Sequence, residues 1–309
     1  MRKSLQLQAE LGPVFDVTLD GEDGAPVGGE VDHALVMADL VASAANRFNR
    51  VGVRLLPVSH PAFESMLGPL VAGAGARLAY LMLPKLESLA ELERGVTAID
   101  AACAAAGVTR SLPLHGLIET HGGLRAVQAL ADHPRVESLS FGLMDFVSAH
   151  RGAIPASAMG ATGQFSHPLV LRAKLEIAAA CHAAGKTPSH SVVTEFTDMS
   201  ALHDAARRAS REFGFTRMWS IHPTQVRVIV DAFTPDRSEI DDAIAIVVLG
   251  QDAQWAPIRH RSGGQDRLHD RASYRYYWQL LERAQTASLA GQPLLPREVR
   301  ERFFEESPT

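Results

Sequence analysis

The sequence predicts an α/β protein with a (β/α)8, TIM-barrel-like fold whose first strand is missing or irregular, followed by a C-terminal helical extension. Three observations predict this class. Short apolar segments alternate with longer segments of helical apolar spacing, most short segments end in a polar or ionisable residue, and the pattern changes after about residue 235. In a (β/α)-barrel the strand ends converge on one mouth, where such enzymes carry their catalytic residues.

Seven segments have the length and composition of strands that are buried on both faces. They are VFDVTL (14–19), VGVRLL (51–56), LAYLMLP (78–84), LPLHGLIE (112–119), VESLSFG (136–142), HSVVTEF (190–196) and MWSIH (218–222). An eight-stranded barrel requires one more strand, and only a short helix-like segment precedes Val14.

Helices are expected between these strands. Four segments with helical apolar spacing end in glycine, as helices commonly do: 62–73, 87–107, 167–185 and 198–214. Strict alternation of strand and helix indicates parallel strands joined by crossover helices. An open doubly wound sheet would fit as well, but it places its site after a Gly-rich first turn, and GEDGAPVGG lacks the G-x-G-x-x-G spacing. The barrel is therefore favoured.

The C-terminal quarter follows a different pattern. Residues 236–254 and 272–291 are expected to be helices, SGGQDR at 262–267 a loop, and the end a polar tail. We therefore divide the chain into a catalytic barrel over residues 1–235 and a helical extension over 236–309. The extension is expected to serve oligomerisation and to complete the active site.

Composition excludes several classes of function. The net charge is −5 and the Lys and Arg residues are scattered, which argues against a nucleic-acid partner. No apolar run approaches the roughly 20 residues that span a bilayer, and the N-terminus lacks the apolar stretch of a signal peptide. Cys103 and Cys181 lie in Ala-rich helical segments, without metal-binding spacing. We expect buried, reduced thiols in a soluble, cytoplasmic protein.

Two acidic residues are candidate metal ligands. Glu119 in IETHGG and Asp145 in FGLMD follow neighbouring predicted strands. Two carboxylates with few other ligands suit a hard cation such as Mg²⁺, which retains open positions for water or substrate. The histidines lack the spacing of a zinc site. The alternative is that each acid caps the helix that follows it.

Charged residues at other strand ends are candidate catalytic groups. Arg54 lies in an apolar run, where a guanidinium needs an anionic partner. It could form a structural ion pair with Asp20 or Glu22 of the LDGEDGAP motif, or bind a substrate carboxylate and a developing enolate oxygen. Lys85 either pairs with an acid of the mouth or shapes the site. His222 in SIHPTQ could act as general acid or base, or be a hydrogen-bonded structural residue.

Six motifs in order resemble those of the HpcH/HpaI aldolase and citrate lyase beta-subunit family. They are LDGEDGAP, VGVRLL, LMLPK, LIETHGG, LSFGLMDF and SIHPTQ, and they span roughly residues 14–227. The resemblance implies a barrel, often trimeric or hexameric, that cleaves or forms carbon–carbon bonds in hydroxyacyl thioesters such as malyl-, citramalyl- or citryl-CoA.

The resemblance also implies roles for single residues. Glu119 and Asp145 match the family's magnesium ligands, with manganese as the alternative ion, and Arg54 matches its substrate-binding arginine. Asp270 in Leu-His-Asp-Arg resembles a catalytic Asp that a neighbouring subunit contributes. The implied reaction is a retro-Claisen cleavage, in which Asp270 removes the hydroxyl proton while Arg54 and the metal stabilise the enolate.

The chain departs from the family pattern in three respects: the usual Lys after the acidic motif is not evident in VGGEVDHA, and two further departures lie at the mouth. The opening strand S-x-L-[FY]-V-P-G is absent, and Leu56 stands where the family has Asn. Both changes affect the mouth and favour a divergent substrate. Two alternatives therefore stay open: a class II aldolase that acts on free 2-keto acids such as pyruvate, and a barrel subunit that has lost catalysis.

Overall fold

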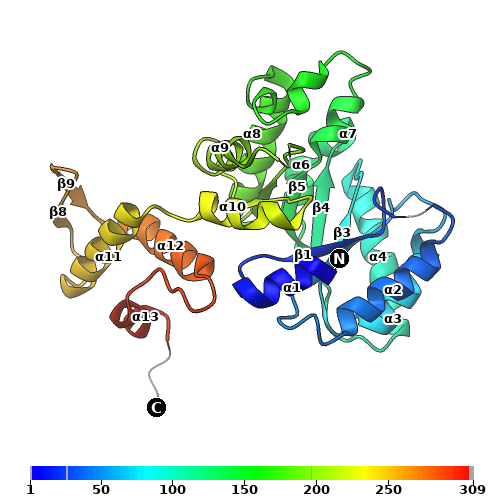
Figure 1. Cartoon of the computed structure of the whole chain (residues 1–309), viewed down its shortest axis with the longest axis horizontal. Helices are drawn as coiled ribbons and strands as arrows, with labels where there is room; N and C mark the ends of the chain where they lie inside the picture. Colours follow the sequence, from blue (N-terminus) through cyan, green and yellow to red (C-terminus); the bar gives the residue numbers. More distant parts are fainter. Residues whose placement is uncertain (1, 26, 196, 306–309) are drawn as a thin grey trace. The chain divides into compact units, whose positions relative to one another are not determined.

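The computed structural model describes residues 2–25, 27–195 and 197–305. The chain divides into two compact units (Figure 1). The first comprises Met1–Ala9 and Phe15–Phe233, and the second comprises Glu10–Val14 and Thr234–Thr309.

A curled sheet of seven parallel strands forms the centre of the first unit. Its strands are β1 (Val17–Asp20), β2 (Val51–Arg54), β3 (Leu78–Leu83), β4 (Leu114–Ile118), β5 (Val136–Phe141), β6 (Thr187–His190) and β7 (Arg217–Met218). Each strand pairs with the next one along the chain, and within the described residues no ladder joins β1 to β7. The predicted α/β, barrel-like class is confirmed, with the sheet open at one seam.

Helices cover the outer face of this sheet (Figure 1). They are α2 (Glu30–Ala42), α3 (Phe63–Ala74), α4 (Leu89–Ala105), α5 (His121–Arg125), α6 (Val127–Asp132), α7 (Leu143–Ser148), α8 (Pro168–Ala183), α9 (Met199–Arg211) and α10 (Pro223–Phe233), with 3-10 turns η1 (Ala156–Met159) and η2 (Gly163–Phe165). All four helices expected from glycine-terminated apolar spacing are present. Their apolar stripes and the strands form one continuous core, which also buries Cys103 and Cys181 as free thiols.

A helix precedes β1, where the family pattern would have its opening strand. Residues Arg2–Leu11 form α1, and Leu5 is buried in the core of the sheet. The Gln8 side chain donates a hydrogen bond from Nε2 to the carbonyl oxygen of Phe15, 2.6 Å away, just before β1. Within the described residues, the first strand expected of a complete barrel is missing, as predicted.

The sixth strand was predicted at the wrong residues. The structure pairs Thr187–His190 with β5, and residues 191–195 are not a strand, while Phe196 lies outside the described residues. The sequence TPSH carries no apolar signal, although its backbone continues the ladder. The apolar Val193 instead lies buried in a loop, where its carbonyl accepts a hydrogen bond from the side chain of Gln225.

The second unit has its own small core, which includes Ile240, Val247 and Leu281. Its elements are α11 (Arg237–Asp252), the antiparallel strands β8 (Ile258–Ser262) and β9 (Gln265–His269), α12 (Arg271–Ala287) and α13 (Arg297–Phe303). The expectation of a loop at 262–267 is wrong. Gly263 and Gly264 both have positive φ and form the two-residue turn of a hairpin. Its strands are mostly polar, so apolar alternation does not reveal them.

No helix in the described part of the chain is long and apolar enough to cross a membrane.

A buried lysine lies on the inner side of α8. The Lys174 side chain is 0% exposed, and its ammonium nitrogen donates to Gln164 Oε1 at 2.9 Å and lies 3.7 Å from the ring centroid of Phe165. No described carboxylate forms an ion pair with it. Burial, and secondarily the charge of Arg208, lower the pKa of Lys174 well below 10.5.

We expect Lys174→Met to increase the free energy of unfolding by about 1–3 kcal/mol at pH 7, because it removes an amine whose burial disfavours the protonated form that the unfolded chain keeps. The unfolded chain binds more protons than the folded chain between the lowered pKa and 10.5, so wild-type stability rises with pH across that window. The advantage of the variant should therefore shrink towards pH 10. Urea denaturation at both pH values, with exposed Lys3→Met as control, measures this. A variant less stable than wild type at pH 7 would contradict it.

Candidate active site

Charged side chains gather at the carboxyl ends of β1 to β5. Asp20 and Arg54 are the last residues of β1 and β2, and their Cα atoms are register partners. Lys85 and Glu119 follow β3 and β4 closely, and Asp145 lies in the first turn of α7. Because the strands are parallel and pair in sequential order, these ends share one edge of the sheet. We call this edge the mouth.

Arg54 is held by two carboxylates. Its Nε and Nη2 donate to the two oxygens of Asp20 at 2.8 and 2.6 Å, and its Nη1 lies 2.8 Å from Glu22 Oε2. Burial disfavours ionisation of Asp20, but the hydrogen bonds from Arg54 and from the backbone N–H groups of Glu22 and Gly24 lower its pKa below the ordinary value. The bidentate geometry fixes the plane of the guanidinium. Both ion-pair partners considered from the sequence are therefore in contact with Arg54.

Lys85 joins the same cluster. Its Nζ lies 2.5 Å from Glu22, 3.2 Å from Asp23 and 3.9 Å from Asp145. Burial opposes its charge, but the hydrogen bond and charge of Glu22 outweigh burial and raise the pKa of Lys85. Lys85 also has a positive φ of 51°, an uncommon conformation for a residue other than glycine. This side chain is a permanent ammonium group.

Glu119 and Asp145 form the anionic part of the mouth. The Glu119 carboxylate is buried and accepts a hydrogen bond from the backbone N–H of Lys85 at 2.9 Å. Burial, and then the charge of Asp145, raise the pKa of Glu119 to about 8. A Cβ on Gly142 would lie 2.2 Å from Glu119 Oε2, so only glycine leaves room for this carboxylate. The glycine of FGLMD is thus required by its acidic neighbour.

The charges at the mouth favour a bound cation. Its carboxylates are Asp20, Glu22, Asp23, Glu119 and Asp145, and its only cationic side chains among the described contacts are Arg54 and Lys85. Within the described ranges, no group of three or more His, Cys, Asp or Glu side chains is arranged around one metal position. A cation held by two carboxylates would take its other ligands from water or substrate, as Mg²⁺ does.

The SIHPTQ segment has structural contacts. The exposed His222 accepts a hydrogen bond at Nδ1 from the backbone N–H of Thr224 at 3.3 Å, and its Nδ1 lies 2.8 Å from Thr224 Oγ1. The fully buried Gln225 donates to Val193 O at 2.9 Å and accepts from Ile221 N at 3.0 Å. Gln225 thereby joins the loops that follow β6 and β7. Sequence analysis did not single it out, since one glutamine in a motif gives no sign of burial.

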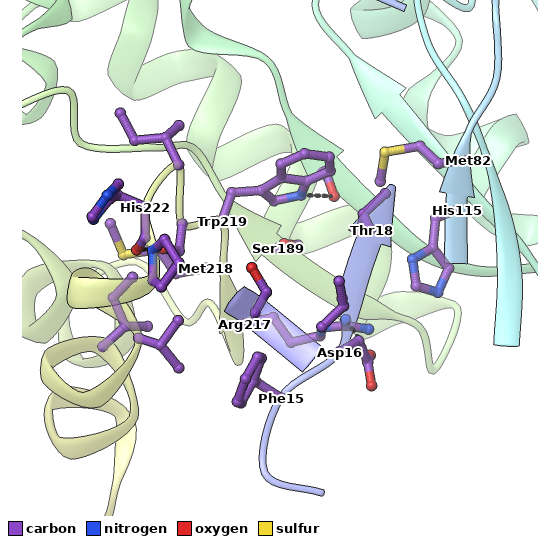
Figure 2. A pocket seen from close by; sticks show the side chains of 18 of the residues that line it. Phe15, Asp16, Thr18, Met82, His115, Ser189, Arg217, Met218, Trp219 and His222 are labelled. Atoms are coloured by element: carbon purple, nitrogen blue, oxygen red, sulfur yellow. Dashed lines mark hydrogen bonds and ion pairs between the residues drawn. The ribbon is translucent and has the colours of Figure 1, made fainter. Parts of the chain in front are cut away.

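A cavity of ≈ 300 Å³ lies beside the mouth, in the interior of the curled sheet (Figure 2). Its polar lining includes Thr18, Tyr80, His115, Ser140, Ser189, Arg217, Trp219 and Ser220. Tyr80 lies 2.6 Å from Thr18 Oγ1 and stacks on His115. Burial, and then the charge of Arg217, lower the pKa of His115 to about 3, so this ring is neutral at physiological pH.

Asp270 belongs to the second unit, where it is the N-cap of α12. Its carboxylate accepts hydrogen bonds from the backbone N–H groups of Ala272 at 3.0 Å and Ser273 at 3.4 Å. The helix expected over residues 272–291 is present as Arg271–Ala287 and begins directly after Asp270. The catalytic role of Asp270 stays a prediction.

A model of the HpcH/HpaI aldolase/citrate lyase family matches residues 14–223. A citrate lyase structure from Burkholderia xenovorans LB400 is 50% identical, with a TM-score of 0.85 over 98% of this chain and 92% of that chain. An L-malyl-CoA/beta-methylmalyl-CoA lyase of Cereibacter sphaeroides (strain ATCC 17029) is 28% identical over 250 residues, which are 77% of each protein. The structure of CitE from Mycobacterium tuberculosis with magnesium, acetoacetate and coenzyme A is 20% identical, with a TM-score of 0.68 over 92% and 95% of the two chains, and shows the shared fold.

Proposed function

The chain belongs to the HpcH/HpaI aldolase/citrate lyase family, and from that premise we propose that it is a magnesium-dependent lyase that cleaves or forms a 3-hydroxyacyl-CoA thioester of the malyl, citramalyl or citryl type. The observation that carries the proposal is the mouth itself. An arginine and a lysine are held among five carboxylates at one edge of the sheet, beside a cavity. A purely structural barrel has little use for this concentration of partly buried charge.

Glu119 and Asp145 would hold the metal ion, with Mn²⁺ as the alternative to Mg²⁺. The donor set fits, because both ligands are hard oxygens, and burial together with the charge of Asp145 disfavours ionisation of Glu119 until a cation binds. When bound, the ion acts as a Lewis acid on the substrate's oxygens. The citrate lyase beta-like CitE, which shares the fold, was solved with magnesium.

Arg54 would bind the substrate. Three of its N–H directions are used by Asp20 and Glu22, and a guanidinium carries further donors. These donors can bind a substrate carboxylate or the developing enolate oxygen. Glu22 and Asp23 also hold Lys85, whose ammonium group adds positive charge to the mouth. Asp20, Glu22 and Lys85 therefore orient Arg54 and balance its charge.

Lys85 stays protonated, so it does not serve as the general base. We assign this role to Asp270 of a neighbouring subunit, in a homo-oligomer that is a trimer or hexamer. Asp270 is exposed at the start of α12, where its carboxylate accepts hydrogen bonds from backbone N–H groups. The extension over residues 236–309 would then serve both assembly and the completion of the site.

Mixing two inactive variants tests this assignment. Asp145→Ala and Asp270→Ala should each be inactive alone, whereas subunits exchanged between the two variants should regain part of the wild-type rate, since some sites then combine an intact mouth with an intact Asp270. Activity after mild dissociation and reassembly is the measurement. An active Asp270→Ala variant would remove Asp270 from the mechanism, and failed complementation between mixed oligomers would place it in its own subunit's site.

The function itself is tested by incubating the protein with malyl-, citramalyl- and citryl-CoA, with Mg²⁺ or with EDTA. We expect metal-dependent cleavage of at least one thioester. If no thioester is cleaved but the protein catalyses pyruvate-dependent exchange, it is an aldolase for free 2-keto acids. If neither reaction occurs while the folded protein binds Mg²⁺, the lyase proposal is wrong.

A further inference from the structure

Trp219 has a fixed position at the mouth. Its backbone N–H donates to His190 O at 3.1 Å, directly after the β6–β7 ladder. Its indole Nε1 donates to Ser140 Oγ of β5 at 3.0 Å (Figure 2). The indole is thus anchored to two strands, and the guanidinium carbon of Arg54 lies 6.0 Å from its ring centroid.

The indole lies at the boundary between the mouth and the cavity. Of the charged mouth residues that the structure describes, only Asp20 lines the cavity, and Glu22, Arg54, Lys85, Glu119 and Asp145 do not. Trp219 lines the cavity and also contacts Arg54. Trp219 therefore lies between Arg54, which does not line the cavity, and the cavity that it lines itself.

The cavity suits a neutral group. Its lining offers hydroxyl groups, a neutral imidazole and apolar side chains such as Met82 and Met218. The carboxylate of Asp16 is already paired with Arg50 at 2.7 Å and Arg217 at 2.5 Å. The charged side chains of the described lining are Asp16, Asp20 and Arg217, so a further carboxylate would have to share the charge of Arg217 with Asp16.

We propose that Trp219 is the specificity-determining residue of the acyl site. Its indole supports the guanidinium of Arg54 from one side and closes the mouth against the cavity, so that wild type prefers acyl groups with no substituent or a methyl substituent. The inference rests on the proposed lyase function. It follows that Trp219→Ala opens the cavity to larger neutral substituents and does not favour an additional carboxylate.

The test compares malyl-CoA with analogues that carry methyl, ethyl or propyl substituents, and with citryl-CoA. In Trp219→Ala the ratio of kcat/KM for the propyl analogue to that for malyl-CoA should rise by about tenfold or more. This is the usual size of the discrimination that a methylene group produces in a hydrophobic pocket. Trp219→Phe retains a ring beside Arg54, so its kcat/KM ratio should lie between those of wild type and Trp219→Ala. Trp255→Phe, in the second unit, is the matched control. An unchanged ratio in Trp219→Ala, or an equal gain for citryl-CoA, would overturn the inference.

A second measurement does not require turnover. In a Trp255→Phe/Trp278→Phe protein, Trp219 is the sole tryptophan, and its emission should change when L-malate is added with Mg²⁺, because the carboxylate binds to the neighbouring guanidinium. Adding Arg54→Gln should abolish the change. An emission response without thioester cleavage would contradict the lyase proposal and support the position of Trp219 beside the carboxylate-binding Arg54. Malate binding by calorimetry with no emission response would refute that position.

Discussion

Asp145→Asn is expected to reduce kcat/KM by at least about 10³-fold and to abolish stabilisation by Mg²⁺. Glu119 would remain as the only carboxylate ligand. One carboxylate next to Lys85 and Arg54 attracts a divalent cation much less than two do, because those side chains already offset part of the negative charge.

The variant should behave differently without metal. The charge of Asp145 contributes to the raised pKa of Glu119, so its removal lessens the repulsion between the two side chains. Asp145→Asn should therefore melt at an equal or higher temperature than metal-free wild type. Thermal denaturation with and without Mg²⁺ gives both results, with the exposed Asp39→Asn as control. A variant that keeps both Mg²⁺-dependent activity and the Mg²⁺ shift in Tm would exclude Asp145 as a ligand.

Arg54→Gln is expected to reduce both activity and stability. Loss of the donors to the enolate oxygen should cost about 3–4 kcal/mol in the transition state, or roughly 10²- to 10³-fold in rate. The variant also leaves Asp20 without its partner and the buried Glu22 with Lys85 alone, which should lower the free energy of unfolding by about 3–5 kcal/mol. This is a large part of the total stability of about 5–15 kcal/mol that is usual for proteins.

A double variant separates the two effects. Arg54→Gln/Asp20→Asn removes the partner charge as well, so it should recover part of the stability and none of the activity.

The single variant Arg54→Gln should also lose stability against acid. In wild type the lowered pKa of Asp20 contributes stability that is present above pH 3.8 and is lost as the pH falls through the folded-state value. Recovery of activity in the double variant would show that Arg54 has only a structural role.

Much of the fold could be predicted because its signals are local. Val51–Arg54 and Leu78–Leu83 are apolar on both faces, and the intervening helix Phe63–Ala74 has apolar positions at helical spacing. The polar TPSH strand and the charged hairpin were missed because their pairing partners, and not their own composition, make them strands. Burial of Lys174 in an apolar environment could not be foreseen either, since a lysine alone gives no sign of it.

The sequence by itself determined which residues follow each strand, and therefore that Asp20, Arg54, Lys85 and Glu119 share one edge of a parallel sheet. Only the tertiary structure decided how they pair: that Arg54 contacts Asp20 and Glu22 together, and that Trp219 lines the cavity beside Arg54. Chain order fixes the end of the strand at which a side chain lies, because strand direction is local. Distances between side chains depend on how the sheet curls and on loop conformations. Both are determined by contacts between residues that lie far apart in the sequence.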